Sequence, residues 1–299
     1  MARARRSLAG KVVAITGGAR GIGRATAAAL SAHGARVAIG DIEASLAQRA
    51  AEELGGGAVG LALDVTDRAS FDAFLRETET RLGPLDVLIN NAGIMPIGPF
   101  VDETDATAQR MVDINLHGVI HGSKLALTRF AARGRGHLVN IASIAGKGGA
   151  PGGATYCATK HAVVGLSDAI SQEVRGTAID VSVVMPIGVN TELYSGLPQM
   201  RGLKTPEPED VAEAIVEALQ TGRYEVYVPK SMAFMVRLVA VLPRRAQESL
   251  GRLLGADQTL TQPDHAARAA YEARLLSSPG RDQSPAAPVA RDIAEKAPI

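Results

Sequence analysis

The sequence contains no tryptophan, and aromatic residues together make up only 3% of the chain. Its formal net charge is +1 at pH 7. Proteins that bind nucleic acid usually offer a cationic field or aromatic side chains on which bases stack, and this sequence offers neither. The composition therefore argues against a nucleic-acid partner and favours a small-molecule one.

Cysteine and long apolar runs are also scarce. Cys157 is the one cysteine, so a disulfide within the chain and a metal site built from cysteines are excluded, as suits a cytoplasmic protein. We expect Cys157 to be a small buried hydrophobe. No run of about 18 apolar residues occurs, so no transmembrane helix is expected. Residues 1–10 include Arg5 and Arg6 without an apolar segment of signal length after them, which predicts a flexible leader.

Short apolar runs rich in β-forming residues alternate with longer helical patterns. Strands separated by helical crossovers predict an α/β fold, a doubly wound parallel sheet of about seven strands with helices on both faces. A late helix is predicted where "PEDVAEAIVEALQTG" begins with acidic residues and ends at Gly222. The predicted strands cover 11–16, 36–41, 58–64, 85–93, 136–143, 180–186 and 224–229.

Glycines crowd the connection between the first predicted strand and the helix after it. The stretch "TGGARGIG" places Gly17, Gly18, Gly21 and Gly23 in the spacing T-G-x-x-x-G-x-G. Glycines let the backbone approach a pyrophosphate, and the N-terminus of a helix offers free N–H groups and a positive dipole end. We therefore predict a dinucleotide site here; the alternative is a turn that is merely tightly packed.

An acidic residue stands at the end of the second predicted strand, where "VAIGD" ends in Asp41. A carboxylate in this position can accept hydrogen bonds from an adenosine ribose and would repel a 2′-phosphate. NAD is therefore expected rather than NADP. Arg20 in the glycine turn could pair with a phosphate, which keeps an NADP-preferring reductase as an alternative, and Asp41 could simply cap a helix.

A tyrosine and a lysine stand four residues apart in "YCATK", within a stretch that otherwise has helical spacing. Tyr156 and Lys160 should project from one helical face and act on the same molecule. An ammonium group beside a phenol favours the phenolate, so we expect Lys160 to lower the pKa of Tyr156. Tyr156 would then serve as an acid or base near neutral pH; the alternative is a chance pair on a solvated face.

Four motifs in this order resemble those of the short-chain dehydrogenase/reductase family: "TGGARGIG", "NNAG" at 90–93, "NIAS" ending in Ser143, and "YCATK". The resemblance covers about residues 11–230 and implies a Rossmann-like fold. It also implies a homodimer or homotetramer that interconverts an alcohol and its carbonyl compound with NAD(H). Sugar-nucleotide epimerases share Y-x-x-x-K, but their glycine turn usually has the spacing T-G-x-x-G-x-x-G, which the turn of this chain does not match. A catalytically silent NAD(H)-sensing or membrane-associated binding protein is the alternative from another class.

The resemblance also implies roles for individual residues. Tyr156 would be the general acid/base, Lys160 would lower its pKa and hold the nicotinamide ribose, and Ser143 would hydrogen-bond the substrate oxygen. Asn115 of "DINLHG" would support a water-mediated proton relay. Donors from Ser143 and Tyr156 would stabilise the negative charge that develops on oxygen when a ketone is reduced.

The sequence and the resemblance together imply cofactor contacts between residues 17 and 191. Asp64 would contact the adenine, residues 91–93 would border the adenosine, and Thr191 would hold the carboxamide. The expected cofactor-binding residues are Gly17, Gly18, Ala19, Arg20, Gly21, Ile22, Gly23, Asp41, Asp64, Val65, Asn91, Ala92, Gly93, Tyr156, Lys160, Pro186, Val189 and Thr191.

One position departs from the family pattern, because Ile187 follows Pro186 where the family usually has glycine. Its side chain is expected to crowd the nicotinamide pocket, which makes the placement of residues 187–191 less secure. His117 and His121 stand four apart on one predicted helix, but no third ligand is recognisable, so no metal site is expected.

The pattern changes after residue 230. We divide the chain into a catalytic domain over 11–230, a C-terminal helical extension over 231–277 and a disordered tail over 278–299. The stretch "SMAFMVRLVAVLPRRAQESLGRLLG" is apolar nearly all round at its start and carries arginines after that. Such a surface needs cover from the substrate cleft, a second subunit or a membrane interface. If it borders the cleft, the substrate should be an apolar alcohol or carbonyl compound.

Overall fold

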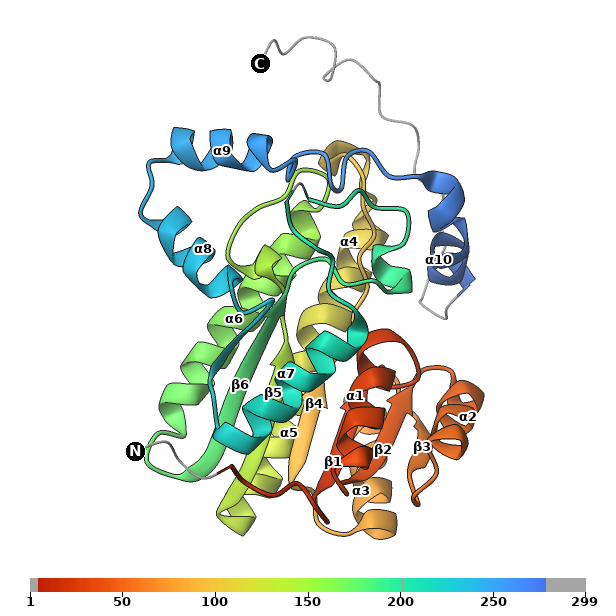
Figure 1. Ribbon diagram of the computed structural model, residues 1–299. Coiled ribbons are helices and arrows are strands. Elements are labelled where there is room, and N and C mark those ends of the chain that lie inside the picture. The colour runs from red at the N-terminus through yellow and green to blue at the C-terminus, as the bar shows by residue number, and fades with distance from the viewer. Residues whose placement is uncertain (1–4, 201, 278–299) are drawn as a thin grey trace.

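The protein is described by a computed structural model that covers residues 5–200 and 202–277 (Figure 1). Seven strands form one sheet in the order β3-β2-β1-β4-β5-β6-β7, and all neighbouring strands are parallel. They are β1 (Val12–Thr16), β2 (Arg36–Asp41), β3 (Val59–Ala62), β4 (Val87–Asn90), β5 (Arg135–Ile141), β6 (Ala178–Pro186) and β7 (Glu225–Val228). The predicted doubly wound α/β fold is confirmed, with each strand inside or within two residues of its predicted range; β6 begins two residues earlier than predicted.

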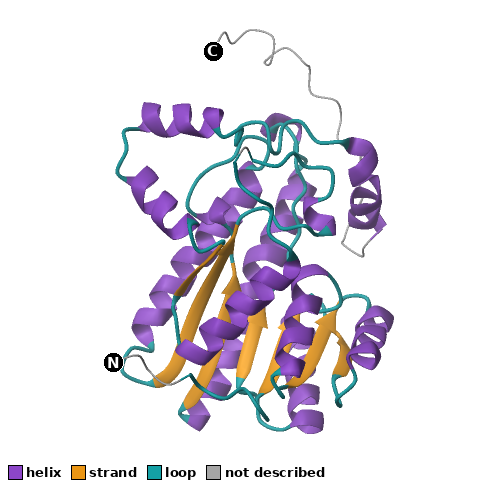
Figure 2. Cartoon of the chain, in the orientation of Figure 1, coloured by secondary structure: helices purple, strands orange, loops and turns teal. Residues whose placement is uncertain are grey.

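Helices cover both faces of the sheet (Figure 2). They are α1 (Gly21–Ala32), α2 (Ala44–Leu54), α3 (Arg68–Leu82), α4 (Asp105–Val112), α5 (Gly118–Arg133), α6 (Ala154–Glu173), α7 (Pro208–Thr221), α8 (Met232–Ala240), α9 (Arg244–Leu253) and α10 (His265–Ser277). α7 begins and ends as its sequence predicts: Glu207 and Asp210 form a capping box, and Gly222 takes a left-handed conformation with φ 70°.

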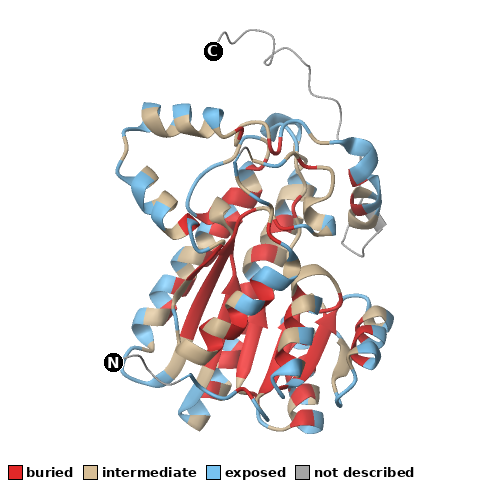
Figure 3. Cartoon of the chain, in the orientation of Figure 1, coloured by how far each residue is buried: buried red, intermediate tan, exposed pale blue. Residues whose placement is uncertain are grey.

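Two apolar layers hold the helices to the sheet, and the strands between them are largely buried, except the edge strand β3 (Figure 3). On one face Leu30 of α1 and Ile215 of α7 pack with Ile15 of β1. On the other face Phe71 and Phe74 of α3 pack with side chains of α5 and α6. Burial on both faces explains why the strands are continuous apolar runs rather than alternating ones.

The chain order reverses at β1, which lies between β2 and β4. Val13 of β1 pairs with Val37 on one side and with Val87 on the other. In doubly wound sheets, ligands bind in the crevice outside the carboxyl ends of the strands at such a switch point. The topology therefore places a binding site beside the glycine turn that follows β1.

The two ends of the described chain lie against this domain. Within the predicted flexible leader, Leu8 is buried and the Arg6 N–H donates to Gln220 O at 2.9 Å, so this part of the leader is packed. The predicted C-terminal helical extension is confirmed as α8, α9 and α10, which lie beyond the carboxyl end of the sheet (Figure 1). None of the described helices is both long and apolar enough to cross a membrane. The predicted disordered tail, 278–299, lies outside the described residues.

Candidate active site

A cavity of about 2310 Å³ opens at the carboxyl end of the sheet. Its walls come from the loops after β1, β2, β4, β5 and β6 and from the C-terminal extension. Most of the sequence-predicted site residues line it: Gly17, Arg20, Gly21, Ile22, Asp41, Asp64, Val65, Asn91, Ala92, Gly93, Ser143, Tyr156, Lys160, Pro186, Val189 and Thr191. Four others, Gly18, Ala19, Gly23 and Asn115, do not line this cavity.

The glycine turn fits closely against the end of β4. Gly17 has φ 60°, and a Cβ on it would lie 2.9 Å from the Ala92 Cα. A Cβ on Gly23 would lie 2.3 Å from Gly17 O, so Gly23 lets the first turn of α1 pack on the loop. The N-cap residue of α1, Arg20, makes no side-chain hydrogen bond to the helix's first N–H groups. The turn therefore presents backbone donors to the cavity, as a pyrophosphate site requires.

Thr16 and Asn91 tie the ends of β1 and β4 together beneath this turn. The Thr16 hydroxyl accepts hydrogen bonds from the N–H groups of Asn91 at 2.9 Å and Ala92 at 3.0 Å. The Asn91 amide donates to Thr16 O and to Gly17 O, both at 3.0 Å. Asn91 thus fixes the loop as well as bordering the cavity. Thr16 was not among the predicted site residues, although it stands first in the glycine motif.

Asp41 lies at the end of β2 on the cavity wall and is largely buried. Its carboxylate accepts the Glu43 N–H at 3.2 Å, and burial raises its pKa. Arg20 lies nearby, but its guanidinium donates to Glu43 at 2.8 Å. The one cation of the glycine turn is therefore already paired with a carboxylate.

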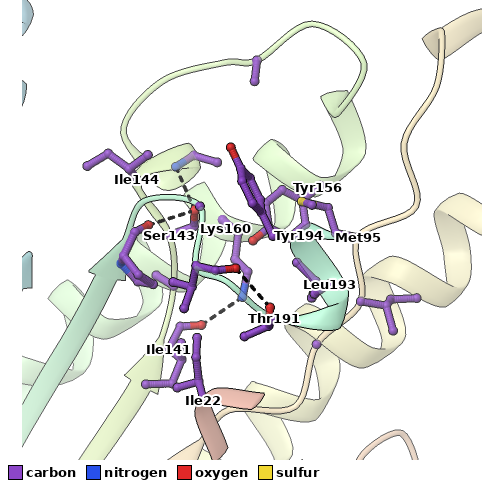
Figure 4. Close-up of a pocket in the computed structure, with 18 of the residues that line it drawn as sticks. Ile22, Met95, Ile141, Ser143, Ile144, Tyr156, Lys160, Thr191, Leu193 and Tyr194 are labelled. Carbon is purple, nitrogen blue, oxygen red and sulfur yellow. Dashed lines mark hydrogen bonds between the residues drawn. The ribbon is translucent and has the colours of Figure 1, made fainter. Parts of the chain in front are cut away.

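Ser143, Tyr156 and Lys160 lie beside one another in the cavity (Figure 4). Ser143 follows β5, and its hydroxyl accepts the Ala145 N–H at 3.1 Å. Tyr156 and Lys160 come from successive turns of α6, and both are buried. The Lys160 ammonium donates to Ile141 O at 2.9 Å and lies 5.7 Å from the centroid of the Tyr156 ring. The predicted placement of both side chains on one helical face is thus observed.

The expected lowering of the Tyr156 pKa is not what this arrangement produces. Burial raises the pKa of the Tyr156 phenol above its ordinary value of 10.0, and a hydrogen bond with Ser143 opposes this only in part. Burial also lowers the pKa of Lys160 from 10.5 to about 8. Because both side chains are desolvated and the ammonium group faces a carbonyl, removal from water outweighs the attraction between ammonium and phenolate.

Asn115 lies behind the cavity wall, in a π-helical turn over Asp113–His117 between α4 and α5. Its side chain is fully buried: Oδ1 accepts the Ile94 N–H at 2.8 Å, and Nδ2 donates to Ile94 O at 2.9 Å. These contacts hold the backbone that follows Gly93. In this structure the Asn115 side chain is a support for the cavity wall, whereas the resemblance implied a part in a proton relay.

The cavity has an apolar half on the far side of Tyr156 from the glycine turn. Met95, Leu193 and Tyr194 lie close to the catalytic candidates (Figure 4). The predicted apolar stretch contributes one face of α8 and part of α9. From these helices Met232, Met235, Val236, Val239, Leu250 and Leu254 line the cavity. Ile187 also lines it, and the same side chain is buried among Met185, Tyr227 and other apolar residues.

Helix α10 closes the cavity with residues that were not among the predicted site residues. The Tyr271 hydroxyl accepts the Met95 N–H at 2.8 Å. Arg268 is 0% exposed, although arginine is rarely buried. Its guanidinium donates to Met95 O at 2.7 Å, Leu193 O at 3.0 Å and Ser195 O at 3.3 Å. One side chain therefore joins two loops of the apolar half.

The two histidines and the cysteine, for which no site was predicted, have ordinary contacts. His117 Nδ1 lies 2.9 Å from Asp113 Oδ1, and His121 Nδ1 lies 3.3 Å from Val65 O. Within the described ranges no cluster of three or more His, Cys, Asp or Glu side chains is arranged to hold a metal ion. Cys157 is buried, and burial raises its pKa.

Comparison with known proteins decides the family. The family model of short chain dehydrogenases matches residues 11–202. The chain belongs to this family. It is therefore an oxidoreductase of the dehydrogenase/reductase type, as the motifs predict, and the matched region contains all four predicted catalytic residues and every predicted cofactor contact.

Curated relatives carry different substrate names. Ketoacyl reductase HetN of Nostoc sp. is 35% identical over 230 residues, which cover 74% of this chain and 79% of the relative. Sorbitol dehydrogenase of Cereibacter sphaeroides is 40% identical over 191 residues, which cover 64% of this chain and 75% of the relative. The 3-alpha-(or 20-beta)-hydroxysteroid dehydrogenase of Mycobacterium tuberculosis is 37% identical over 213 residues, covering 70% and 82%. The relatives therefore leave the substrate open.

A solved structure supports the fold. A short chain dehydrogenase/reductase from Burkholderia phymatum, crystallised in complex with NAD, superposes with a TM-score of 0.72 over 86% of this chain and 99% of that chain. The two sequences are 24% identical, so this likeness speaks for the fold alone.

Proposed function

We propose that this protein is an NAD(H)-dependent dehydrogenase that interconverts an apolar alcohol and its ketone or aldehyde. The observation that carries the proposal is the position of Ser143, Tyr156 and Lys160 in the cavity, between the glycine turn and the apolar half. A cavity of about 2310 Å³ exceeds an ordinary small-ligand pocket of roughly 300–1,000 Å³ and has room for a dinucleotide together with a large substrate.

The residues present fit a dinucleotide cofactor. The glycine turn and the N-terminus of α1 would hold the pyrophosphate, Asp41 the adenosine ribose, Asp64 and Val65 the adenine, and Lys160 with Thr191 the nicotinamide end. When bound, the cofactor supplies or accepts the hydride. The chain supplies the proton and the field around the reacting oxygen.

Tyr156 would carry the proton. Because burial keeps its pKa above the ordinary value, the phenol is protonated at neutral pH and is ready to donate to a carbonyl oxygen that becomes an alcohol. In the oxidation direction the phenolate takes the proton from the alcohol. Ser143 would donate a hydrogen bond to the same oxygen, and Lys160 would favour the phenolate. Asn115 would act through the backbone of Ile94 as a positioning residue.

The walls of the apolar half favour an apolar substrate. The methionine, leucine and valine side chains of α8 and α9 offer an apolar surface to the substrate. Each Å² of apolar surface that the substrate removes from water there contributes about 25 cal/mol to the binding free energy. We expect the purified protein to reduce NAD with large apolar secondary or primary alcohols at a higher kcat/KM than with small polyols. Formation of NADH across a panel of both kinds measures this. Tight NAD binding without turnover on any alcohol would favour the silent binding protein instead.

Cofactor choice depends on Asp41, and NAD is proposed over NADP because Arg20 is paired with Glu43. Replacing Asp41 with alanine should remove a ribose contact and the repulsion of a 2′-phosphate. At a few ångströms this repulsion is about 1–4 kcal/mol, so the ratio of kcat/KM for NAD to that for NADP should fall about tenfold or more. Glu43→Ala is the matched control, because it frees Arg20 and leaves Asp41 in place.

The control should raise NADP efficiency without weakening NAD. An unmodified protein that already prefers NADP would show that Asp41 has been misassigned and that Arg20 decides the choice.

Assembly and location belong to the same proposal. A homodimer or homotetramer is implied by the family resemblance, and a cytoplasmic location suits the single cysteine. Light scattering of the purified protein measures the first.

A further inference from the structure

Several large apolar side chains of the C-terminal extension are exposed. In the described ranges seven large hydrophobic side chains are exposed, and four of them lie between residues 231 and 256. We call these four, Phe234, Leu238, Val241 and Leu253, the α8–α9 surface. Phe234 and Val241 are 74% and 79% exposed. A cluster of this kind on a soluble domain usually marks an interaction site.

The helix geometry separates this surface from the cavity. Phe234, Leu238 and Val241 stand at positions i, i+4 and i+7, which share one face of α8 and the turn after it. Met235, Val236 and Val239 point the other way and line the cavity. The α8–α9 surface is therefore an outward face with no part in the substrate cavity. α8 and α9 also form the outermost layer at this end of the molecule (Figure 1).

The segment that carries these side chains is rich in arginine. Residues 231–256 contain four arginines, Arg237, Arg244, Arg245 and Arg252, and a single acidic residue, Glu248. Arg244 is paired with Glu248 at 2.9 Å, and its side chain is 90% exposed. Arg237 lies 3.8 Å from Glu225 and lines the cavity, so the arginines on the outside are Arg244, Arg245 and Arg252. The whole chain has a net charge of only +1, so this concentration is local. Exposed apolar side chains and exposed arginines on the same two helices are what an anionic lipid surface binds.

A second copy of the chain fits this surface less well. In a two-fold dimer the same patch faces itself, which would bring the arginines of one subunit against those of the other. Anionic head groups instead complement the arginines, and the acyl region receives the apolar side chains. α8 and α9 have 9 and 10 residues, too few to span a bilayer, so they would lie in its interface.

We propose that the α8–α9 surface docks the protein peripherally on anionic membranes, with Phe234, Leu238, Val241 and Leu253 in the interface and the exposed Arg244, Arg245 and Arg252 on the head groups. This docking does not depend on the proposed reaction. Docking would place α8 and α9, which line the cavity, next to the lipid bilayer in which apolar alcohols dissolve.

The test is co-sedimentation of the full-length protein with vesicles of phosphatidylcholine alone or of phosphatidylcholine with phosphatidylglycerol. We expect binding to the anionic vesicles that weakens with added salt, and little binding to neutral ones. Reversing the charge at two arginines, Arg244→Glu with Arg245→Glu, should lower the partition coefficient at least tenfold. Phe234→Glu with Val241→Glu should do the same, because it removes apolar contact and adds two negative charges that the anionic head groups repel.

The matched control reverses two arginines elsewhere, Arg76→Glu with Arg81→Glu on α3, which also pair with acidic residues four positions away. This control should bind anionic vesicles as the unmodified protein does. Equal loss of binding in the control, or no binding by the unmodified protein, would overturn the proposal. So would a change of molecular mass in lipid-free solution on Phe234→Glu with Val241→Glu, since the surface would then be a subunit interface. Turnover of a water-soluble alcohol, measured alongside, reports separately on the proposed reaction.

Discussion

Replacing Tyr156 with phenylalanine is expected to lower turnover by about a thousandfold, within the range of roughly 10²–10⁴ that general acid–base catalysis contributes. The substitution removes one hydroxyl and keeps the buried ring on α6, so the cavity should keep its shape. NAD affinity should change little, because the glycine turn and Asp41 are untouched. Steady-state kinetics with an alcohol that the unmodified protein oxidises, together with NAD binding measured by calorimetry, separates the two quantities.

Tyr194→Phe is the matched control for this variant. Tyr194 also lines the cavity, but its hydroxyl hydrogen-bonds Pro198 O at 3.1 Å and is assigned no proton transfer. Its loss should change kcat by a few-fold at most. For the unmodified protein, alcohol oxidation should also rise with pH above neutral, since burial raises the pKa of Tyr156 and oxidation needs the phenolate. Near-normal turnover of Tyr156→Phe would remove Tyr156 from the mechanism.

The strands could be predicted because local sequence determines them. A run such as 36–41 is apolar, rich in β-forming residues and bounded by turns, and in a doubly wound sheet both faces of every central strand must be apolar. The glycine turn was predictable for the same local reason. Gly17 and Gly23 meet Ala92 and Gly17 O so closely that no larger side chain fits. The glycine pattern therefore predicts the close packing of the turn in this half of the cavity.

The protonation of the site could not be predicted from spacing. The spacing of four positions from Tyr156 to Lys160 establishes that both lie on one face of α6, but it does not establish how far either side chain is removed from water. That depends on β5, Met95 and α10, which are distant in sequence. Desolvation reverses the expected direction of the Tyr156 pKa. The π-helical turn that directs the Asn115 side chain to the backbone of Ile94 is likewise not predictable from the local sequence.

Helix α10 shows the same limit most clearly. The pattern "DHAARAAYEARLL" predicts a helix, and the helix is present, but an arginine in such a segment is ordinarily a solvated surface residue. Arg268 is buried because its acceptors, Met95, Leu193 and Ser195, belong to loops more than 70 positions away in sequence. Only the tertiary structure shows that this arginine joins the two loops of the apolar half.

Replacing Arg268 with methionine is therefore expected to lower the free energy of unfolding by about 3 kcal/mol or more. Methionine fills much of the space, but the carbonyl groups of Met95, Leu193 and Ser195 lose their donor while they stay buried. The guanidinium also stacks over the Tyr271 ring, 4.7 Å from its centroid, and its Nε lies 3.4 Å from Glu272, an ion-pair distance rather than a hydrogen bond. Equilibrium unfolding in urea measures the change.

The kinetic effect of this variant should fall on the substrate rather than the cofactor. Met95 and Leu193 line the apolar half, so freeing their loops should raise KM for apolar alcohols, while NAD affinity, which depends on the glycine turn, stays near its original value. Arg268→Lys should recover part of the stability, because an ammonium group can satisfy some of the three carbonyls. The matched control is Arg252→Met on exposed α9, which should change the unfolding free energy by less than about 0.5 kcal/mol. If Arg268→Met unfolds at the same urea concentration as this control, the buried arginine does not hold the loops together, and the shape of the apolar half must be set by α8 and α9 instead.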